Sequence, residues 1–351
     1  MKRCLACDGE NLKLVLDLGK QPLANSYDND GLYPLALNAC EDCNHAQLTE
    51  SVQPKELYTN YYYVSGTSNT LKQWFADFAE RFDPVGDILD VASNDGSLLL
   101  EFRKRGWETL GVDPAKNLDT QGIVTIHDFF GEDWNFGNKK FDIITAFNVV
   151  AHGPDPLSIL KGIYNNLKDD GEAYVMTSQC KMFENGQFDT VYHEHHSFFN
   201  LHSFQTLANR AGFTDISYTI EPIHGGSYLF KLTKDDNYVE FPVKRPDYEG
   251  FVDKVGQIRP YKIVGYGAAA KAVVVINSLG QKLDYVVDDA PLKIGKKIQG
   301  TDIPIVSPDY MAEDNDNLII IVYAWNFLPE IKRRIRELRP DRDDVILTHW
   351  N

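Results

Sequence analysis

The feature of the sequence that most constrains its fold is an alternation of apolar runs with helical segments between residues 68 and 235. Residues 71–82 form the first helical stretch. The apolar runs that follow lie at 88–92, 109–113, 123–128, 141–148 and 172–178. Strands that alternate with helices pair in parallel and are covered on both faces. This region is therefore predicted to be an α/β domain built on five parallel strands.

Two further β-rich runs, 213–220 and 227–233, end this region. Only the six residues EPIHGG separate them, which is too short for a helical crossover, so the two runs are predicted to form an antiparallel hairpin. Five parallel strands followed by a hairpin is the layout of a class I methyltransferase rather than of a dinucleotide dehydrogenase.

A charged linker and a second α/β unit are predicted after this domain. Residues 261–280 read as strand, glycine turn and helix, and the turn GYGAAAKA resembles a weak mononucleotide-binding motif with Lys271 available for a phosphate. The fold could equally serve as a platform without a cofactor. The predicted domains are thus a zinc-binding domain (1–67), a methyltransferase domain (68–235), and a linker with a C-terminal Rossmann-like domain (236–351).

Four of the five cysteines fall into two CxxC pairs, and Cys180 stands alone. The first 60 or so residues are turn-rich and too few to fold without a staple. In a reducing compartment, paired CxxC motifs indicate a metal before a disulfide. Four thiolates leave no open position for water, so a structural zinc is predicted, against the alternative of four unrelated thiols. Its ligands are Cys4, Cys7, Cys40 and Cys43.

The run DVASNDGSLLLEF places a small, glycine-containing turn between a buried strand and a helix, where main-chain amides can approach a cofactor. Asp113 ends the next strand, where a carboxylate can accept hydrogen bonds from ribose hydroxyls. The turn lacks the GxGxxG pattern that admits a pyrophosphate, which favours S-adenosylmethionine over NAD. The predicted cofactor-binding residues are Asp90, Ala92, Asn94, Gly96, Asp113, Asp128 and Asn148.

Titratable side chains are densest in the segment 190–203, TVYHEHHSFFNLHS. A general base with supporting donors is the favoured interpretation, because an imidazole beside a carboxylate and a phenol can take a proton near pH 7. A metal site and plain surface histidines are the alternatives. His152, after the fourth strand, can act at the same edge of the sheet or simply cap a helix. The tyrosine run at 57–70 can be a lid or packed aromatics, and the pattern alone does not choose.

The chain is acidic, with 51 Asp and Glu against 35 Lys and Arg. A formal charge of −16 disfavours nucleic acid and anionic lipid as partners. The apolar stretch Leu318–Leu328 is too short for a membrane helix, and no hydrophobic segment of a signal peptide is seen. A soluble, cytoplasmic protein is expected.

Ordered motifs along essentially the whole chain resemble the zinc-containing sugar C-methyltransferases of deoxysugar pathways, which act on TDP-linked 4-keto sugars. They are CxxC, QPLANSY, YPLALNACEDC, YYYVSGTSNT, SNDGSLL, GVDPA, AHGPD, FDTVYHEHHSFFN, HGGSYLF, GYGAAAK, VVDDAPLKIGKKIQGTDIPI and AWNF. The resemblance implies an enzyme that uses S-adenosylmethionine, with His195 as the base and Tyr192, Glu194 and His152 assisting it. A monomer that binds a nucleotide-linked sugar is expected. Ala92 replaces a usual glycine, and Gly66 and Thr67 replace a serine and an aromatic residue.

The leading hypothesis is therefore methyl transfer to a carbon of a nucleotide-linked keto sugar through an enolate. An O- or N-methyltransferase of a sugar is the alternative enzyme. A third hypothesis is a non-catalytic module that binds a nucleotide sugar.

Overall fold

The computed structural model describes residues 1–26, 29–59, 61–83, 85–178, 181–248, 250–251, 263–342 and 344–348. Cys180 and most of the predicted linker after residue 248 lie outside them. The chain forms two compact units, each assembled from separated segments. The first unit consists of Met1–Leu14, Leu37–Cys180 and Glu194–Arg245, and the second of Val15–Ala36, Lys181–His193 and Pro246–Asn351.

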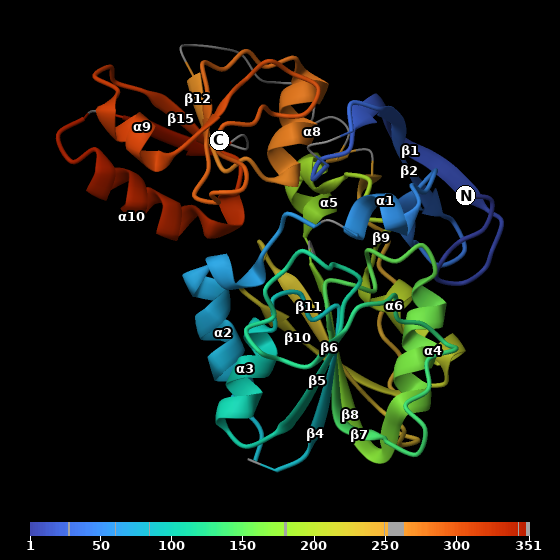
Figure 1. Cartoon of the computed structure of the whole chain (residues 1–351). Helices are drawn as coiled ribbons and strands as arrows, with labels where there is room; N and C mark the ends of the chain where they lie inside the picture. The colour runs from blue at the N-terminus through green and yellow to red at the C-terminus, as the bar shows by residue number, and fades with distance from the viewer. Residues whose placement is uncertain are drawn as a thin grey trace. The chain divides into compact units, whose positions relative to one another are not determined.

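A seven-stranded sheet with the order β10-β11-β8-β7-β4-β5-β6 forms the centre of the first unit (Figure 1). Five of its strands pair in parallel. These are β4 (Asp87–Val91), β5 (Glu108–Val112), β6 (Thr125–Ile126), β7 (Phe141–Phe147) and β8 (Leu167–Ser178). The remaining two, β10 (Asp215–Glu221) and β11 (Ser227–Thr233), form the predicted antiparallel hairpin, with β11 paired to β8. The class I methyltransferase layout predicted from the sequence is confirmed.

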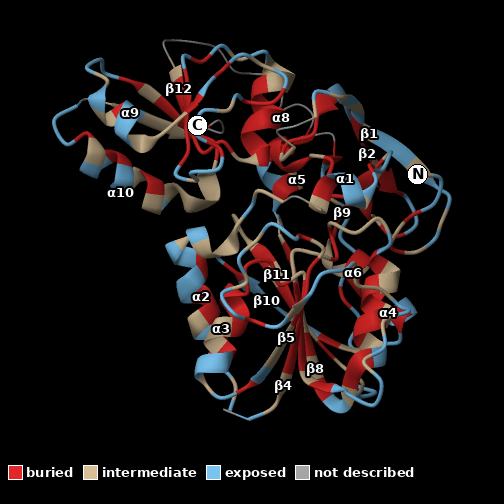
Figure 2. Ribbon diagram, viewed as in Figure 1, coloured by how far each residue is buried: buried red, intermediate tan, exposed pale blue. Residues whose placement is uncertain are grey.

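Helices cover both faces of this sheet (Figure 1). One face carries α2 (Asn69–Ala79) and α3 (Ser97–Lys104), whose apolar side chains pack with Ile88 and Ile143. The other carries α4 (Pro156–Asn166) and α6 (Leu201–Ala211), which pack with Leu89 and Ile144. The central strands are consequently buried on both sides, as Figure 2 shows. This double burial is why their sequences read as continuous apolar runs.

A four-stranded sheet with the order β1-β2-β3-β9 contains most of the N-terminal segment. Its strands are β1 (Leu12–Pro22), β2 (Leu32–Cys40), β3 (Ala46–Leu48) and β9 (Ser197–Phe198). The sequence predicted a turn-rich segment here and did not predict strands as long as β1 and β2, which have 11 and 9 residues. It also missed β9, which the histidine-rich segment contributes. A short helix, α1 (Pro54–Tyr58), and a 3-10 turn, η1 (Ser65–Thr67), lead into α2.

The second unit contains a parallel sheet with the order β14-β13-β12-β15-β16. Its strands are β12 (Ile263–Tyr266), β13 (Val286–Val287), β14 (Ile305–Val306), β15 (Ile319–Val322) and β16 (Val345–Thr348). Its helices are α8 (Ala270–Leu279), α9 (Pro308–Glu313) and α10 (Leu328–Leu338). The unit also contains the short helical segments α5 (Met182–Asn185), η2 (Phe188–Thr190) and η3 (Trp325–Phe327). The predicted C-terminal Rossmann-like fold is confirmed.

Within the described part of the chain, no helix has both the length and the apolar character needed to cross a membrane.

Candidate functional site

The four cysteine side chains converge in the first unit. The Sγ atoms of Cys4 and Cys43 lie 3.6 Å apart, and so do those of Cys7 and Cys40. All four sulfurs lie within 4.8 Å of one another. Sulfurs about 2.3 Å from a tetrahedral zinc ion are about 3.8 Å from each other, so this group has the dimensions of a zinc site. With thiolates at all four positions, the site is closed to substrate.

The two CxxC turns have the same backbone conformation. The residue after each pair, Asp8 or Asn44, has a left-handed φ of 67° or 57°. Its N–H donates to the carbonyl of the first cysteine in the pair, Cys4 or Cys40, over 2.9 Å. This repeated turn directs each pair of sulfurs to one side, which explains why the two short motifs build one site.

The predicted cofactor turn connects β4 to α3 through three left-handed residues. Ala92, Asn94 and Gly96 have φ values of 61°, 51° and 74°. A left-handed conformation costs a residue with a Cβ atom about 1 kcal/mol, and glycine adopts it freely. Ala92 thus has a conformation that glycine would adopt without strain.

Asp113 directly follows β5 and faces this turn. Its carboxylate accepts the N–H of Asn94 at Oδ2 and the N–H of Ala115 at Oδ1, both over 2.8 Å. Burial raises the pKa of Asp113, although the two amides oppose the shift. The two hydrogen bonds fix the carboxylate in the place where the sequence predicts recognition of a ribose.

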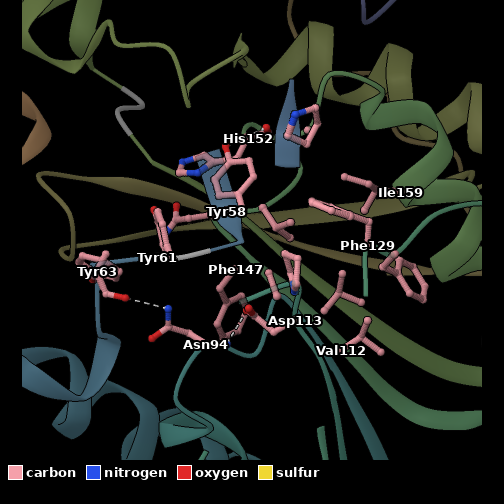
Figure 3. A pocket seen from close by; sticks show the side chains of 18 of the residues that line it. Tyr58, Tyr61, Tyr63, Asn94, Val112, Asp113, Phe129, Phe147, His152 and Ile159 are labelled. Carbon is pink, nitrogen blue, oxygen red and sulfur yellow. Dashed lines mark hydrogen bonds between the residues drawn. The ribbon is translucent and has the colours of Figure 1, made fainter. Parts of the chain in front are cut away.

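The side chain of Asn94 connects the cofactor turn to the tyrosine-rich segment. Its Oδ1 accepts the N–H of Ser65 over 2.9 Å, and its Nδ2 donates to the carbonyl of Tyr63 over 3.0 Å (Figure 3). One residue further on, the N–H of Gly66 donates to Oδ2 of Asp95 over 3.0 Å. A Cβ on Gly66 would lie 2.3 Å from that oxygen. Glycine at position 66 therefore permits this close approach.

A cavity of about 540 Å³ lies beside these residues, within the first unit. Its volume falls in the range of small-molecule sites. Of the predicted cofactor residues, five line it: Ala92, Asn94, Asp113, Asp128 and Asn148. Asp90 and Gly96 are not among the residues that line it. The wall also includes Tyr58, Tyr61, Tyr63 and His152, as Figure 3 shows.

Two polar side chains at the cavity have oxygen atoms that can accept hydrogen bonds from a bound molecule. Oδ1 of Asn148 is buried and has no hydrogen-bond partner among the described residues. Asp128 is exposed at the cavity, and its Oδ1 accepts the N–H of Phe129 over 2.8 Å. Together with the carboxylate of Asp113, these groups offer acceptors for the hydroxyl, amino and ammonium donors of S-adenosylmethionine.

Asp90 lies near the end of β4 and is 4% exposed. Its Oδ1 accepts a hydrogen bond from Thr145 over 2.7 Å. Burial, reinforced by Asp113 and Asp95 and opposed by the Thr145 hydroxyl, raises the pKa of Asp90 to about 7.

The histidine-rich segment is held on both sides by main-chain hydrogen bonds. On one side, Leu48 N–H donates to the carbonyl of His196 over 3.0 Å, and β9 pairs with β3. On the other, Ser197 N–H donates to the carbonyl of Ala151 over 3.0 Å. The segment therefore lies between the zinc-bearing sheet and the loop after β7, which carries His152.

Two predicted catalytic histidines are brought together by this arrangement. The imidazole rings of His152 and His195 have centroids 4.5 Å apart. His152 lies on the cavity wall, whereas His195 is 3% exposed and is not among the lining residues. Burial, with His196 and His224 nearby, lowers the pKa of His152, so its imidazole is neutral at neutral pH.

His196 fixes the backbone at His152. Its Nδ1 lies 2.8 Å from the carbonyl oxygen of His152, and its Nε2 lies 2.8 Å from Oγ of Ser51. A carbonyl oxygen can only accept, so Nδ1 carries the proton. The buried imidazole thus links His152 to the segment that precedes α1.

Tyrosines of the run at 57–70 reach the same place. Tyr58 Oη donates to the carbonyls of His152 and Glu194, each over 3.2 Å. Tyr61 Oη donates to the carboxylate of Glu194, which is 2% exposed, over 3.2 Å. Tyr192, the fourth predicted catalytic residue, is half-buried and belongs to the second unit.

Sequence reasoning did not single out Tyr58, Tyr61 and Ser51, and it named His196 only as a member of the histidine-rich cluster, without a role. The tyrosine run did attract attention, but its spacing does not say which rings face a cavity. The metal alternative for the histidine segment has no geometric support, because within the described ranges only the four cysteines group as metal ligands.

Comparison with protein families divides the chain into three matched regions. Residues 4–58 match a family described as "Putative zinc binding domain". Residues 63–218 match a methyltransferase domain, and residues 231–348 match a C-methyltransferase C-terminal domain.

Among individual proteins, the chain is similar to C-methyltransferase NovU of Streptomyces niveus. The two are 28% identical, and the match covers 93% of this chain and 90% of NovU. A ubiquinone biosynthesis O-methyltransferase of Actinobacillus pleuropneumoniae serotype 7 is 31% identical over 26% of this chain and 44% of its own length. A solved Thermotoga maritima methyltransferase, possibly acting on histamine nitrogen, has a TM-score of 0.39 and 16% identity, covering 47% of this chain and 89% of its own.

The strand order, the carboxylate after β5 and the match over residues 63–218 define a class I methyltransferase that uses S-adenosylmethionine. The zinc-binding and C-terminal regions narrow this class further. The chain is an S-adenosylmethionine-dependent C-methyltransferase with a zinc-binding domain, as its motifs predicted, and its cofactors are S-adenosylmethionine and a zinc ion held by Cys4, Cys7, Cys40 and Cys43.

Proposed function

We propose that this C-methyltransferase acts on a nucleotide-linked keto sugar and methylates the carbon next to the carbonyl through an enolate. The observation that carries the mechanism is the pairing of the His152 and His195 imidazoles, 4.5 Å apart, with His152 on the wall of the cavity that Asp113 lines. The sugar substrate rests on the resemblance of the whole series of motifs.

In this mechanism His195 is the base that removes the proton next to the carbonyl. A neutral imidazole accepts a proton at neutral pH, and Glu194 orients it and stabilises the resulting positive charge. Tyr192 and His152 donate hydrogen bonds to the enolate oxygen as negative charge develops there. S-adenosylmethionine supplies the electrophilic methyl group.

The cofactor site is proposed to centre on Asp113, which accepts hydrogen bonds from the ribose hydroxyls. Two amide hydrogen bonds already hold this carboxylate in one orientation, so binding orders little further. The rest of the site is proposed to consist of Asp90, Ala92, Asn94, Gly96, Asp128 and Asn148. A cytoplasmic, monomeric enzyme completes the proposal.

The test is His195→Asn, with exchange of the substrate's α-proton measured in deuterated water. Both ligands should bind with unchanged affinity, because the base acts mainly on the transition state. Turnover should fall by about 100-fold or more, and deuterium should no longer enter the α-carbon. In the wild-type enzyme, activity should rise with pH as one group loses its proton.

His202→Asn is the matched control, because His202 lies on the first turn of α6, seven residues beyond His195. It should keep normal exchange and turnover. Near-normal exchange in His195→Asn would instead assign the base to Glu194 or His152. An enzyme that methylates oxygen or nitrogen would show no exchange at carbon even in the wild type.

A further inference from the structure

Three of the sequence motifs meet at one cluster in the second unit, through residues that the proposed chemistry does not use. Asp189 comes from FDTVYHEHH, Lys271 from GYGAAAK, and Trp325 with Asn326 from AWNF. Trp325 Nε1 donates to Oδ2 of Asp189 over 2.7 Å. Nζ of Lys271 lies 3.9 Å from the centroid of the Trp325 ring and 3.5 Å from Oδ1 of Asn326.

Asp189 is the middle residue of η2, a turn whose own hydrogen bonds make it rigid. The N–H of Thr190 donates to the carbonyl of Gln187 over 3.2 Å, and that of Val191 to the carbonyl of Phe188 over 2.9 Å. Asp189 is fully buried, as are its neighbours on either side, and η2 packs against α8. Tyr192 lies two residues beyond this turn, so fixing Asp189 also fixes the start of the histidine-rich segment.

The cluster contains charges that packing alone does not require. Lys271 is 7% exposed, in a stretch of α8 whose residues are buried all round. Burial lowers its pKa to about 8, and the negative charge of Asp189 opposes this shift. A buried charge is costly unless its surroundings compensate it, and replacing such groups with apolar residues is often stabilising. A carboxylate and an ammonium retained here therefore favour a role in orientation over one in stability.

We propose that Asp189 is a positioning residue: Trp325, whose ring packs against Lys271, holds the carboxylate of Asp189 and so sets the main chain from which Tyr192 and, three residues later, His195 project. The catalytic roles of Tyr192 and His195 rest on the proposed function, but the attachment of η2 to Trp325 does not.

The attachment is tested by hydrogen–deuterium exchange in the full chain, which needs no substrate. Trp325→Phe keeps an aromatic side chain and removes the N–H donor to Asp189 together with the five-membered ring of the indole. Amides of a peptide spanning residues 187–193 should exchange about tenfold faster or more. Tyr285→Phe is the matched control, because it removes a hydrogen bond of the same kind, to Asp314 over 2.9 Å, elsewhere in this unit. Exchange in that peptide should then match the wild type, and unchanged exchange in Trp325→Phe overturns the proposal.

The positioning role is tested by turnover at a temperature where every variant is folded. Asp189→Asn keeps an oxygen that can accept from Trp325 and should retain at least about half of kcat, whereas Asp189→Leu should lose about tenfold or more. KM and the affinity for S-adenosylmethionine should stay within about twofold in both. A merely structural role would lower the melting temperature of Asp189→Leu and leave kcat unchanged, which overturns the proposal.

If Trp325→Phe does not fold, Asp189→Asn and Asp189→Leu test the attachment instead. Exchange of the peptide 187–193 is then compared between these two variants. A wild-type enzyme that methylates no nucleotide-linked keto sugar refutes the proposed function. The exchange experiment still decides whether η2 is attached as described.

Discussion

Replacing Asp90 with asparagine should remove a pH dependence of stability that one buried carboxyl gives the first unit. The pKa of Asp90 is raised from its ordinary value of 3.8 to about 7, chiefly by burial. Between these two values the folded protein holds a proton that the unfolded chain releases. The stabilisation from the protonated carboxyl is therefore complete below the lower value and is lost as the pH rises through the upper one.

The expected magnitude follows from this window. Since pH 5 lies about two units below the folded-state pKa, and each unit corresponds to about 1.36 kcal/mol, the wild type should lose about 2.7 kcal/mol between pH 5 and pH 8. Asparagine does not titrate. The free energy of unfolding of Asp90→Asn, relative to the wild type, should rise by this amount over the same range. Fixed costs, such as an unsatisfied amide N–H, are equal at both pH values and cancel.

The measurement is hydrogen–deuterium exchange of peptides from β4 and β7 at increasing urea, because the chain has two units and a global probe would mix them. Asp142→Asn on β7 is the control. Burial alone would raise the pKa of Asp142, but the N–H of Asp87 and Lys168 outweigh it and lower the pKa. Asp142 is ionised at both pH values, so its replacement should cost the same at each. A difference between Asp90→Asn and the wild type that is equal at pH 5 and pH 8 would refute the reasoning.

Two further predictions concern the zinc site and the cofactor turn. Cys40→Ser should abolish stoichiometric binding of zinc, measured by elemental analysis. Because the closed thiolate site stabilises the N-terminal segment, this segment should unfold before binding of S-adenosylmethionine is affected. Retention of one zinc per chain would contradict this prediction. Gly66→Ala should weaken binding of S-adenosylmethionine by about tenfold, measured by calorimetry, because its Cβ would displace the turn at Asp95. The Cβ would also lie 2.5 Å from Oγ of Ser97, so the same substitution should cost little only in a background that carries both Asp95→Ala and Ser97→Ala. An equal loss in that background would exclude the clash.

The sequence predicts the parts of this fold that depend on local pattern. The run predicted as a strand at 141–148 is β7 (Phe141–Phe147), because a strand buried on both faces must be apolar throughout. The run at 123–128 yields only Thr125–Ile126, since β6 is an edge strand with one neighbour and Val124 is 67% exposed. The zinc ligands are equally readable, because each CxxC pair is a local turn.

The remainder depends on contacts between residues distant in sequence. Nothing in the spacing of Asn94 indicates that its amide holds Tyr63 and Ser65, or that Tyr61 reaches Glu194, 133 residues away. The predicted roles of His195, Glu194, Tyr192 and His152 stay predictions, as do the domain boundaries after residues 67 and 235. What the structure adds is the apposition of the His152 and His195 rings, which no local pattern specifies.

The pairing of β9 with β3 has a consequence for the order of events during synthesis. A nascent chain of about 50 residues already contains all four zinc ligands and the first three strands of the N-terminal sheet, whereas Ser197 and Phe198 complete that sheet about 150 residues later. At about 5 to 20 residues per second, this is a delay of about 8 to 30 s. The metal can thus be bound well before the histidine-rich segment is synthesised. The edge of β3 that pairs with β9 must stay unpaired until that segment follows.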